Sequence, residues 1–231
     1  MFGGKMKALT FSFDDGVTQD IRFIEILNKY NLKATFNLNS ELLGNDGFLD
    51  IGDKKISHVK VNADEVKKIY EGHEVAVHTL THPLLPDCSD EEIIRQVEED
   101  RKNLEKLVGY DIVGMAYPCG GVNNNDRVAE IIKKNTKIRY SRTITSSHSF
   151  DLQDNLYRFN PTGRYTDEAD NLLELGRKFL ELKADSPQIF YIWGHTYEFD
   201  INDTWAEIEE FCKMMANRDD IFYGTNREVL L

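Results

Sequence analysis

Two histidines and two aspartates in this chain have the residue types and spacing of a metal-dependent hydrolytic site. His78 and His82 are separated by three residues in the segment His78-Thr-Leu-Thr-His82. If this segment forms one helical turn, both imidazoles project from one face and can bind one metal ion, with zinc favoured by neutral nitrogen ligands. A zinc protease of the H-E-x-x-H type is excluded, because Thr79 stands where its glutamate base would be.

A catalytic zinc ion that is bound by two histidines needs at least one more protein ligand. Asp14 and Asp15, which end a strand-like apolar segment, can supply it. Alone, Asp14-Asp15-Gly16 is only a turn signal. Together with the histidines, one aspartate would bind the metal and the other would take a proton from water that attacks a carbonyl group. The four residues therefore indicate hydrolysis.

The rest of the chain alternates strand-like apolar segments with segments of helical periodicity. Such an order predicts an α/β fold with a parallel sheet and outer helices, because parallel strands need crossover connections. Closure into a barrel fits about seven or eight strands, and an open doubly wound sheet fits the same pattern. Strands are expected at residues 7–13, 33–38, 74–77, 113–117, 138–144, 156–160, 189–193 and 221–223, and helices at 20–30, 63–70, 89–108, 126–134, 167–182 and 204–216.

Polar clusters follow several of these strands, at the edge where such sheets carry their active sites. Asp14 and Asp15 follow the first strand, and His78 follows a later one. The segment 117–121 and His195 follow two more. We therefore expect these groups to meet at the carboxyl ends of the strands.

Length and composition indicate one domain over residues 1–231. No linker, repeat or low-complexity segment interrupts the chain, and 41% of its residues are hydrophobic. Residues 41–62 are rich in glycine and aspartate and are expected to be an inserted excursion with room for a short hairpin. Ser89 and Glu92 have the spacing of a capping box at the start of a long helix.

Charge and cysteine content limit the partners. The formal net charge of -12 excludes nucleic acid and anionic membrane surfaces as natural partners. Cys88, Cys119 and Cys212 are odd in number and far apart, which argues against a disulfide framework and a cysteine-built zinc site. Because no segment resembles a signal peptide or a membrane span, a cytoplasmic location is expected, or secretion if an export signal has been removed.

At this point the residues resemble the polysaccharide deacetylases with a NodB-type domain, which form carbohydrate esterase family four. The segments Thr10-Phe-Ser-Phe-Asp-Asp-Gly16 and His78-Thr-Leu-Thr-His82-Pro resemble the first two motifs of that family. Tyr117-Pro-Cys-Gly120 resembles the third, and Trp193-Gly-His195 the last. The resemblance implies a distorted (β/α) barrel of about seven parallel strands that removes acetyl groups from an N-acetylated carbohydrate.

The resemblance also implies a role for each matching residue. Asp14 matches the general base, and His195 matches the general acid that protonates the departing group. Asp15, His78 and His82 match the ligands of the metal, which is Zn²⁺ or another divalent ion such as Co²⁺ or Ni²⁺. The residues expected to contact the substrate, including the backbone N–H of the third motif that would bind the oxyanion, are Tyr117, Pro118, Cys119, Gly120, Trp193 and Glu198.

The third motif departs from the family pattern. Ala116 stands two residues before its proline, where the family has an arginine that orients the base. Arg142 and Arg164 are the candidates to replace that arginine in space.

The last motif departs as well. Trp193 and Tyr197 either stack on a sugar face or belong to the core. Glu198 either bonds a substrate hydroxyl or amine, or is a solvated loop charge. The sequence leaves both choices open.

Three functions remain possible for the same residues. The chain could remove N-acetyl groups, act as an O-acetyl carbohydrate esterase, or bind carbohydrate with a degenerate centre, as Ala116 would suggest. A Cys119 nucleophile with His195 as its base would leave the aspartates and paired histidines without a purpose. The oligomeric state and the particular acetylated substrate stay open, and the histidines expected outside the site are His58, His73 and His148.

Overall fold

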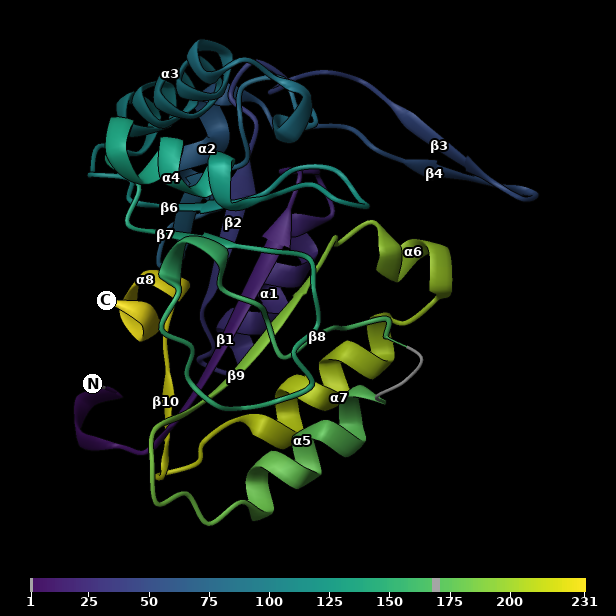
Figure 1. Cartoon of the computed structure of the whole chain (residues 1–231). Coiled ribbons are helices and arrows are strands. Elements are labelled where there is room, and N and C mark those ends of the chain that lie inside the picture. The colour runs from purple at the N-terminus through teal and green to yellow at the C-terminus, as the bar shows by residue number, and fades with distance from the viewer. Residues whose placement is uncertain (1, 168–170) are drawn as a thin grey trace.

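A curled sheet of parallel strands forms the centre of the protein. The structure, a computed structural model, describes residues 2–167 and 171–231 (Figure 1). The strands of this sheet are β1 (Lys7–Asp14), β2 (Ala34–Leu38), β5 (Glu74–Val77), β6 (Gly114–Ala116), β7 (Tyr140–Arg142), β8 (Gly163–Arg164), β9 (Gln188–Gly194) and β10 (Ile221–Tyr223). Their order is β7-β6-β5-β2-β1-β9-β8, and β10 pairs with β1 beside this path.

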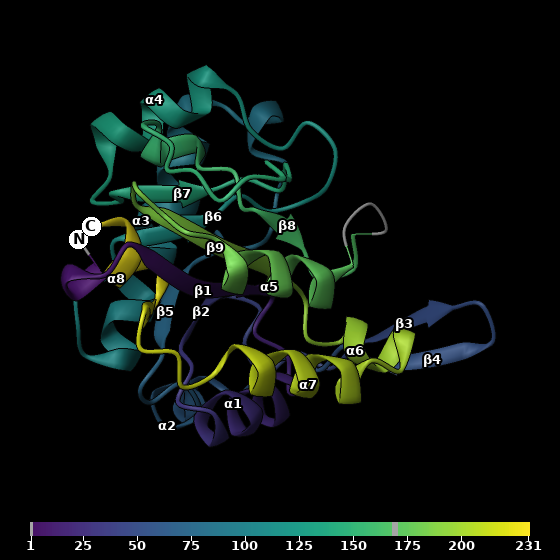
Figure 2. The same ribbon diagram turned by 90° about the horizontal axis from the view of Figure 1, so that it is seen from below.

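Helices lie outside the sheet, as the strand–helix order predicts (Figure 2). Within the described residues, no helix combines the length and the apolar content that crossing a membrane requires. The helices are α1 (Asp20–Lys29), α2 (Val66–Ile69), α3 (Asp90–Val108), α4 (Asp126–Asn135), α5 (Leu172–Glu181), α6 (Glu198–Asn202), α7 (Trp205–Met215) and α8 (Asn226–Leu230).

Helix α3 shows how the local sequence sets these elements. The Ser89 side chain accepts a hydrogen bond from the backbone N–H of Glu92, and Gly109 ends the helix in the left-handed conformation. Glu92 does not complete the expected capping box, because its carboxylate instead binds the side chains of Arg95 and Gln96.

The sheet is buried on both faces. Every residue of β1 is buried, since helices cover one face and the barrel interior the other. Phe13 packs against Phe23 of α1 and Phe199 of α6, with ring centroids 4.5 and 5.7 Å away. This packing fixes β1, whose last residue is Asp14, relative to two helices.

Residues 159–165 join the two edges of the curled sheet. Phe159 donates its backbone N–H to Ser141 O at 3.0 Å, next to the β7 edge. Thr162 donates to Tyr191 O at 2.8 Å, on β9. The prediction of a distorted barrel of about seven parallel strands is therefore confirmed, with the sheet curled into a half-barrel.

Some element boundaries differ from the prediction. The strand expected at 156–160 is wrong: Leu156–Arg158 forms a 3-10 helix, because the Asn155 side chain accepts from the N–H of Tyr157. The helix expected at 167–182 begins at Leu172 after the cap residue Asn171, and residues 168–170 of that prediction lie outside the described residues.

The excursion at residues 41–62 contains the expected hairpin. Strands β3 (Phe48–Ile51) and β4 (Lys54–Ser57) pair antiparallel and project away from the sheet (Figures 1 and 2). Its returning end is bound to the loop after β1, since Thr18 N donates to Val59 O at 2.8 Å and Val61 N to Gly16 O at 2.9 Å. The excursion is therefore part of the framework beside Asp15.

Candidate active site

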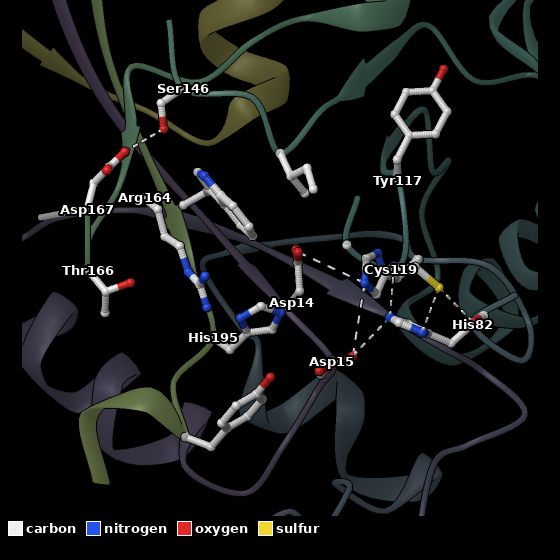
Figure 3. Close-up of a pocket in the computed structure, with 15 residues that line it drawn as sticks. Asp14, Asp15, His82, Tyr117, Cys119, Ser146, Arg164, Thr166, Asp167 and His195 are labelled. Atoms are coloured by element: carbon white, nitrogen blue, oxygen red, sulfur yellow. Dashed lines mark hydrogen bonds and ion pairs between the residues drawn. The ribbon is translucent and has the colours of Figure 1, made fainter. Parts of the chain in front are cut away.

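The polar residues predicted from the sequence meet in one cleft of about 690 Å³ at the carboxyl ends of the strands (Figure 3). Asp14 ends β1, His78 follows β5, and His195 follows β9. Figure 3 shows Asp15, His82 and Cys119 on one side of this cleft and Ser146, Thr166 and Asp167 on the other. The described residues that line it are Asp14, Asp15, His78, His82, Tyr117, Cys119, Gly120, Ile144, Ser146, Arg164, Thr166, Asp167, Trp193, His195 and Tyr197.

Asp15, His78 and His82 form a candidate metal centre. One ligand atom from each lies within 4.8 Å of the other two. Asp15 Oδ1 is 4.0 Å from His78 Nε2 and 3.7 Å from His82 Nε2. The sequence prediction that these three side chains converge is confirmed.

The two histidines converge through a loop and not through the helical turn that their spacing suggested. Thr79 has a φ of 71° and His82 a φ of 61°, both left-handed. The Asn39 amide donates to the carbonyl oxygens of His78 and Thr79, at 2.5 and 2.9 Å, and Asp100 accepts from the backbone N–H of His78 at 3.2 Å. These bonds hold a conformation that non-glycine residues rarely adopt.

The protonation states of the histidines suit a metal ion. His78 Nδ1 lies 2.9 Å from the carbonyl oxygen of Ala116, which leaves Nε2 as the free ligand atom. Burial lowers the pKa of His78 to about 4 and also lowers the pKa of His82, so both rings are neutral at pH 7. Two neutral imidazoles and one carboxylate are a donor set that zinc accepts.

Two residues of the excursion contact Asp15 and were missed by the sequence analysis. Lys60 donates to the backbone oxygen of Asp15 at 2.7 Å, and its Nζ is 3.4 Å from Oδ1. His58, expected outside the site, has its Nε2 3.5 Å from Oδ2. Burial alone would raise the pKa of Asp15, but the bond to His58 and the charge of Lys60 hold it well below its usual value. Nothing local in the sequence of a polar insertion signals such contacts.

Asp14 is held by an arginine from a different strand than the family pattern predicts. Nη2 of Arg142 bonds both carboxylate oxygens of Asp14, at 2.5 Å to Oδ1, and the Asn37 amide donates to Oδ1 at 2.8 Å. Ala116 of β6 and Arg142 of β7 are register partners. Burial opposes ionisation of Asp14, but Arg142 and the nearby histidines lower its pKa overall. Of the two candidate arginines, Arg142 occupies this position.

His195 has a carboxylate partner in Glu198, the first residue of α6. Glu198 accepts from the His195 backbone N–H at 3.2 Å, and Glu198 Oε1 lies 3.2 Å from His195 Nδ1. Arg164 donates to the same carboxylate. Glu198 is only 5% exposed and is not among the described residues that line the cleft, so its position does not support the expected contact with substrate.

In the third motif, Cys119 turns its backbone N–H toward the metal centre. Its φ is 67°, and its N–H lies 3.5 Å from His82 Nε2. Asn123 holds the turn by donating to the carbonyl oxygen of Cys119 at 2.9 Å. The Cys119 thiol donates to the carbonyl oxygen of His82 at 3.4 Å, and burial raises its pKa, which disfavours a thiol nucleophile.

The other expected substrate contacts divide into cleft residues and buried supports. Gly120 and Tyr117 line the cleft, with the Tyr117 hydroxyl bonded to Tyr157 O at 2.8 Å, whereas Pro118 is buried and does not line it. Trp193 is 5% exposed, so its ring is largely covered by protein. Tyr197 lines the cleft with its ring 5.0 Å from that of His195.

The curled parallel sheet with an aspartate–histidine centre at its carboxyl edge is the arrangement expected of a carbohydrate deacetylase. The chain belongs to the polysaccharide deacetylase family, whose family model matches residues 3–140.

Two curated relatives agree with this assignment. The chain is 30% identical over 129 residues to the peptidoglycan-N-acetylglucosamine deacetylase PgdA of Listeria monocytogenes. The aligned segment covers 54% of this chain and 24% of that protein. It is 32% identical over 100 residues to a chitooligosaccharide deacetylase of Rhizobium leguminosarum, 42% of this chain and 39% of that protein. The matched segment therefore spans less than half of either relative.

The fold of a solved deacetylase covers the whole chain. A variant of the peptidoglycan deacetylase PdaC from Bacillus subtilis superposes with a TM-score of 0.55 and 21% identity, covering 100% of this chain and 92% of that one. This likeness concerns the fold alone.

Proposed function

We propose that this chain is a metal-dependent deacetylase that hydrolyses the acetamido group of an N-acetylated sugar. Membership of the polysaccharide deacetylase family supports the reaction class. The single observation that carries the metal dependence is the convergence of Asp15, His78 and His82 within 4.8 Å.

These three side chains would hold Zn²⁺ or another divalent ion such as Co²⁺ or Ni²⁺. When bound, the ion supplies Lewis-acid polarisation of the acetyl carbonyl. Lys60 bonds the backbone oxygen of Asp15 and forms an ion pair with its carboxylate, which His58 also contacts. The Ala116 carbonyl orients the His78 ring.

Asp14 is the proposed general base. Its lowered pKa keeps it ionised at neutral pH, so it can accept a proton from the water that attacks the acetyl carbon. Arg142 and Asn37 fix the carboxylate by bonds to its oxygens. A base held in one orientation loses little entropy when the water binds.

His195 is the proposed general acid for the leaving nitrogen. Burial lowers its pKa to about 4, so the ring is neutral in the resting site. The proton that the attacking water gives to Asp14 balances the one that His195 takes up and delivers to the leaving nitrogen. The Glu198 carboxylate beside Nδ1 stabilises the imidazolium that then forms, and it directs Nε2 to the cleft. The Cys119 backbone N–H, which is directed at His82 Nε2, is the proposed donor to the oxyanion.

The substrate class follows from the relatives and the charge. The two curated relatives act, by their names, on peptidoglycan and on chitooligosaccharides. Both substrates carry N-acetylated sugars. A chain with a formal net charge of -12 accommodates a neutral or cationic glycan more readily than a polyanion.

Acetate release from N-acetylglucosamine oligomers tests the proposal. Protein stripped with a chelator should lose activity and recover it on addition of Zn²⁺ or Co²⁺. Activity that survives complete metal removal would contradict the metal dependence. The variant Asp15→Asn should retain less metal, measured by elemental analysis after gel filtration.

O-acetyl ester hydrolysis is a second candidate, favoured by the low pKa of His195. An ester leaves readily as an alkoxide and depends less on a proton donor than an amide does. His195→Ala should therefore reduce ester cleavage less than amide cleavage. A degenerate binding protein is a weaker candidate, because Arg142 occupies the place left by Ala116.

A further inference from the structure

Trp193 lies beneath the two arginines that serve the proposed base and the proposed acid. The guanidinium carbon of Arg142 is 4.6 Å from the centroid of the Trp193 ring, and that of Arg164 is 5.3 Å away. Arg142 bonds Asp14, and Arg164 bonds Glu198. One indole ring is therefore shared by two separate arginine–carboxylate pairs.

The strand register explains why these groups meet. Trp193 of β9 has Ser12 of β1 as its partner on one side and Arg164 of β8 on the other. The Ser12 hydroxyl accepts from Nε of Arg142 at 3.1 Å, which brings the β7 arginine to the same level of the barrel. The arrangement is a consequence of the fold.

Of the two cations, Arg142 lies in the interior, whereas the Arg164 side chain is 40% exposed. The Arg142 side chain is fully buried, so it has lost its hydration, and its carboxylate partner neutralises only one side of it. The face of an indole carries negative quadrupole potential and attracts guanidinium groups, most strongly when water is absent. Trp193 therefore stabilises both cations, and the buried Arg142 more strongly than the partly exposed Arg164.

The indole also contacts the proposed acid. The rings of Trp193 and His195 meet edge to face, with centroids 5.8 Å apart. Trp193 borders the cleft, but the residue is only 5% exposed, so little of its surface is left for stacking on a sugar.

We propose that Trp193 is a positioning residue that fixes the Arg142–Asp14 pair and the Arg164–Glu198–His195 chain relative to each other. The kinetic consequences of this inference rest on the proposed function. The predicted positioning of Arg142, Arg164 and His195 by the ring does not. The inference assigns to Trp193 a role in aligning the two proton-transfer groups, in place of the expected contact with substrate.

Fluorinated tryptophans provide a test that keeps the shape of the ring. Each added fluorine weakens the attraction between the indole face and a cation. Incorporated at position 193, a series with increasing fluorine content should lower kcat by about tenfold overall and leave KM within about twofold. A KM that rises while kcat stays constant would overturn the proposal, because it would indicate that the ring contacts substrate.

Trp205, the second tryptophan of the chain, is the matched control. Its ring also lies under a cation, with the Arg22 guanidinium carbon 4.3 Å from the centroid, and it packs in α7, away from the cleft. The same fluorinated series at Trp205 should leave kcat and KM unchanged. An equal loss of kcat at both positions would refute a specific role for Trp193.

Nitrogen NMR of the His195 ring separates this inference from the proposed function, since it needs no turnover. In the wild-type protein, the bond to Glu198 should favour the tautomer protonated at Nδ1. Trp193→Leu, or Trp193→Phe if the leucine variant does not fold, should shift the His195 resonances toward a mixture of tautomers. Unchanged His195 resonances in a folded variant would overturn the inference, whether or not the protein deacetylates any sugar.

Discussion

Arg142 bonds both carboxylate oxygens of Asp14, 128 positions away in the sequence, through one terminal nitrogen. The arginine comes from β7, whereas the family motif would place it on β6 at Ala116, its register partner. The register suggests that an arginine on either of these neighbouring strands could reach the same carboxylate, which the double variant below tests.

Replacing Arg142 should therefore impair the base without touching the metal centre. Arg142→Lys keeps the charge but loses the planar geometry of the guanidinium, and we expect kcat to fall by about 100-fold. Arg142→Ala leaves a buried carboxylate unpaired and should also reduce the free energy of unfolding by about 3–5 kcal/mol. Acetate release and chemical denaturation measure the two effects.

The double variant with Ala116→Arg and Arg142→Ala is the matched control for this prediction. The new guanidinium would reach Asp14 from the neighbouring strand, in the space that Arg142 leaves. We expect the double variant to be more active than the single variant Arg142→Ala. A double variant as inactive as the single one, with metal still bound, would contradict the equivalence of the two positions.

Lys60 should influence how tightly the site binds metal. Asp15 has a φ of 84°, an unfavourable conformation for an aspartate, and Lys60 bonds its backbone oxygen. Lys60→Met should lower Zn²⁺ affinity by about tenfold, measured by competition with a chromophoric chelator. Lys54→Met, which removes only a surface bond from the hairpin to Ile201 O, is the control. Equal affinities for wild type and Lys60→Met would show that the strained turn does not need the lysine.

The core of the site could be predicted from the sequence for a physical reason. Asp14, Asp15, His78 and His195 each follow a strand whose apolar pattern is local, and parallel strands bring their carboxyl ends to one edge. The choice between Arg142 and Arg164 could not be made, because it depends on the register between β6 and β7. The proximity of Lys60 to Asp15 depends on pairing between residues 59–61 and 16–18, which no local pattern encodes.

The conformation of the histidine loop was beyond sequence reasoning for a different reason. The H-x-x-x-H spacing is compatible with a helix, but Asn39 and Asp100 hold the segment in another shape from distant parts of the chain. The residue types of Thr79 and His82 do not reveal their left-handed backbone conformation, since glycine and asparagine are the residues that mark it most reliably. Tertiary bonds decided the local structure here.

His73 should contribute to loss of stability in acid. Burial lowers its pKa to about 4, and its Nδ1 accepts from Ala34 N at 3.1 Å, which requires the neutral ring. Below pH 6.5 the His73 ring becomes protonated in the unfolded chain but stays neutral in the folded chain. The unfolded state is therefore favoured increasingly as the pH falls toward 4, and the stabilisation present at pH 7 is lost. The loss from this group is at most about 3 kcal/mol.

Comparison of His73→Gln with wild type at two pH values measures that contribution. His78 and His195, whose pKa values are also lowered to about 4, are present in both proteins and cancel in the comparison. The variant should be less stable than wild type at pH 7, but its unfolding free energy should fall less between pH 7 and about pH 4.5. Identical pH slopes would argue that His73 titrates normally.

Glu198 should be required for proton donation to the leaving group. In Glu198→Gln the bond to His195 Nδ1 remains possible, but the negative charge that stabilises the imidazolium is gone. We expect kcat for amide cleavage to fall by about 100-fold and kcat for cleavage of an activated acetyl ester to fall far less, because an alkoxide leaves without a full proton transfer. Glu210→Gln, an exposed change on α7, is the control and should leave both rates unchanged. Equal losses for amide and ester in Glu198→Gln would indicate that Glu198 only maintains the loop, and the acid role of His195 would then lose its support.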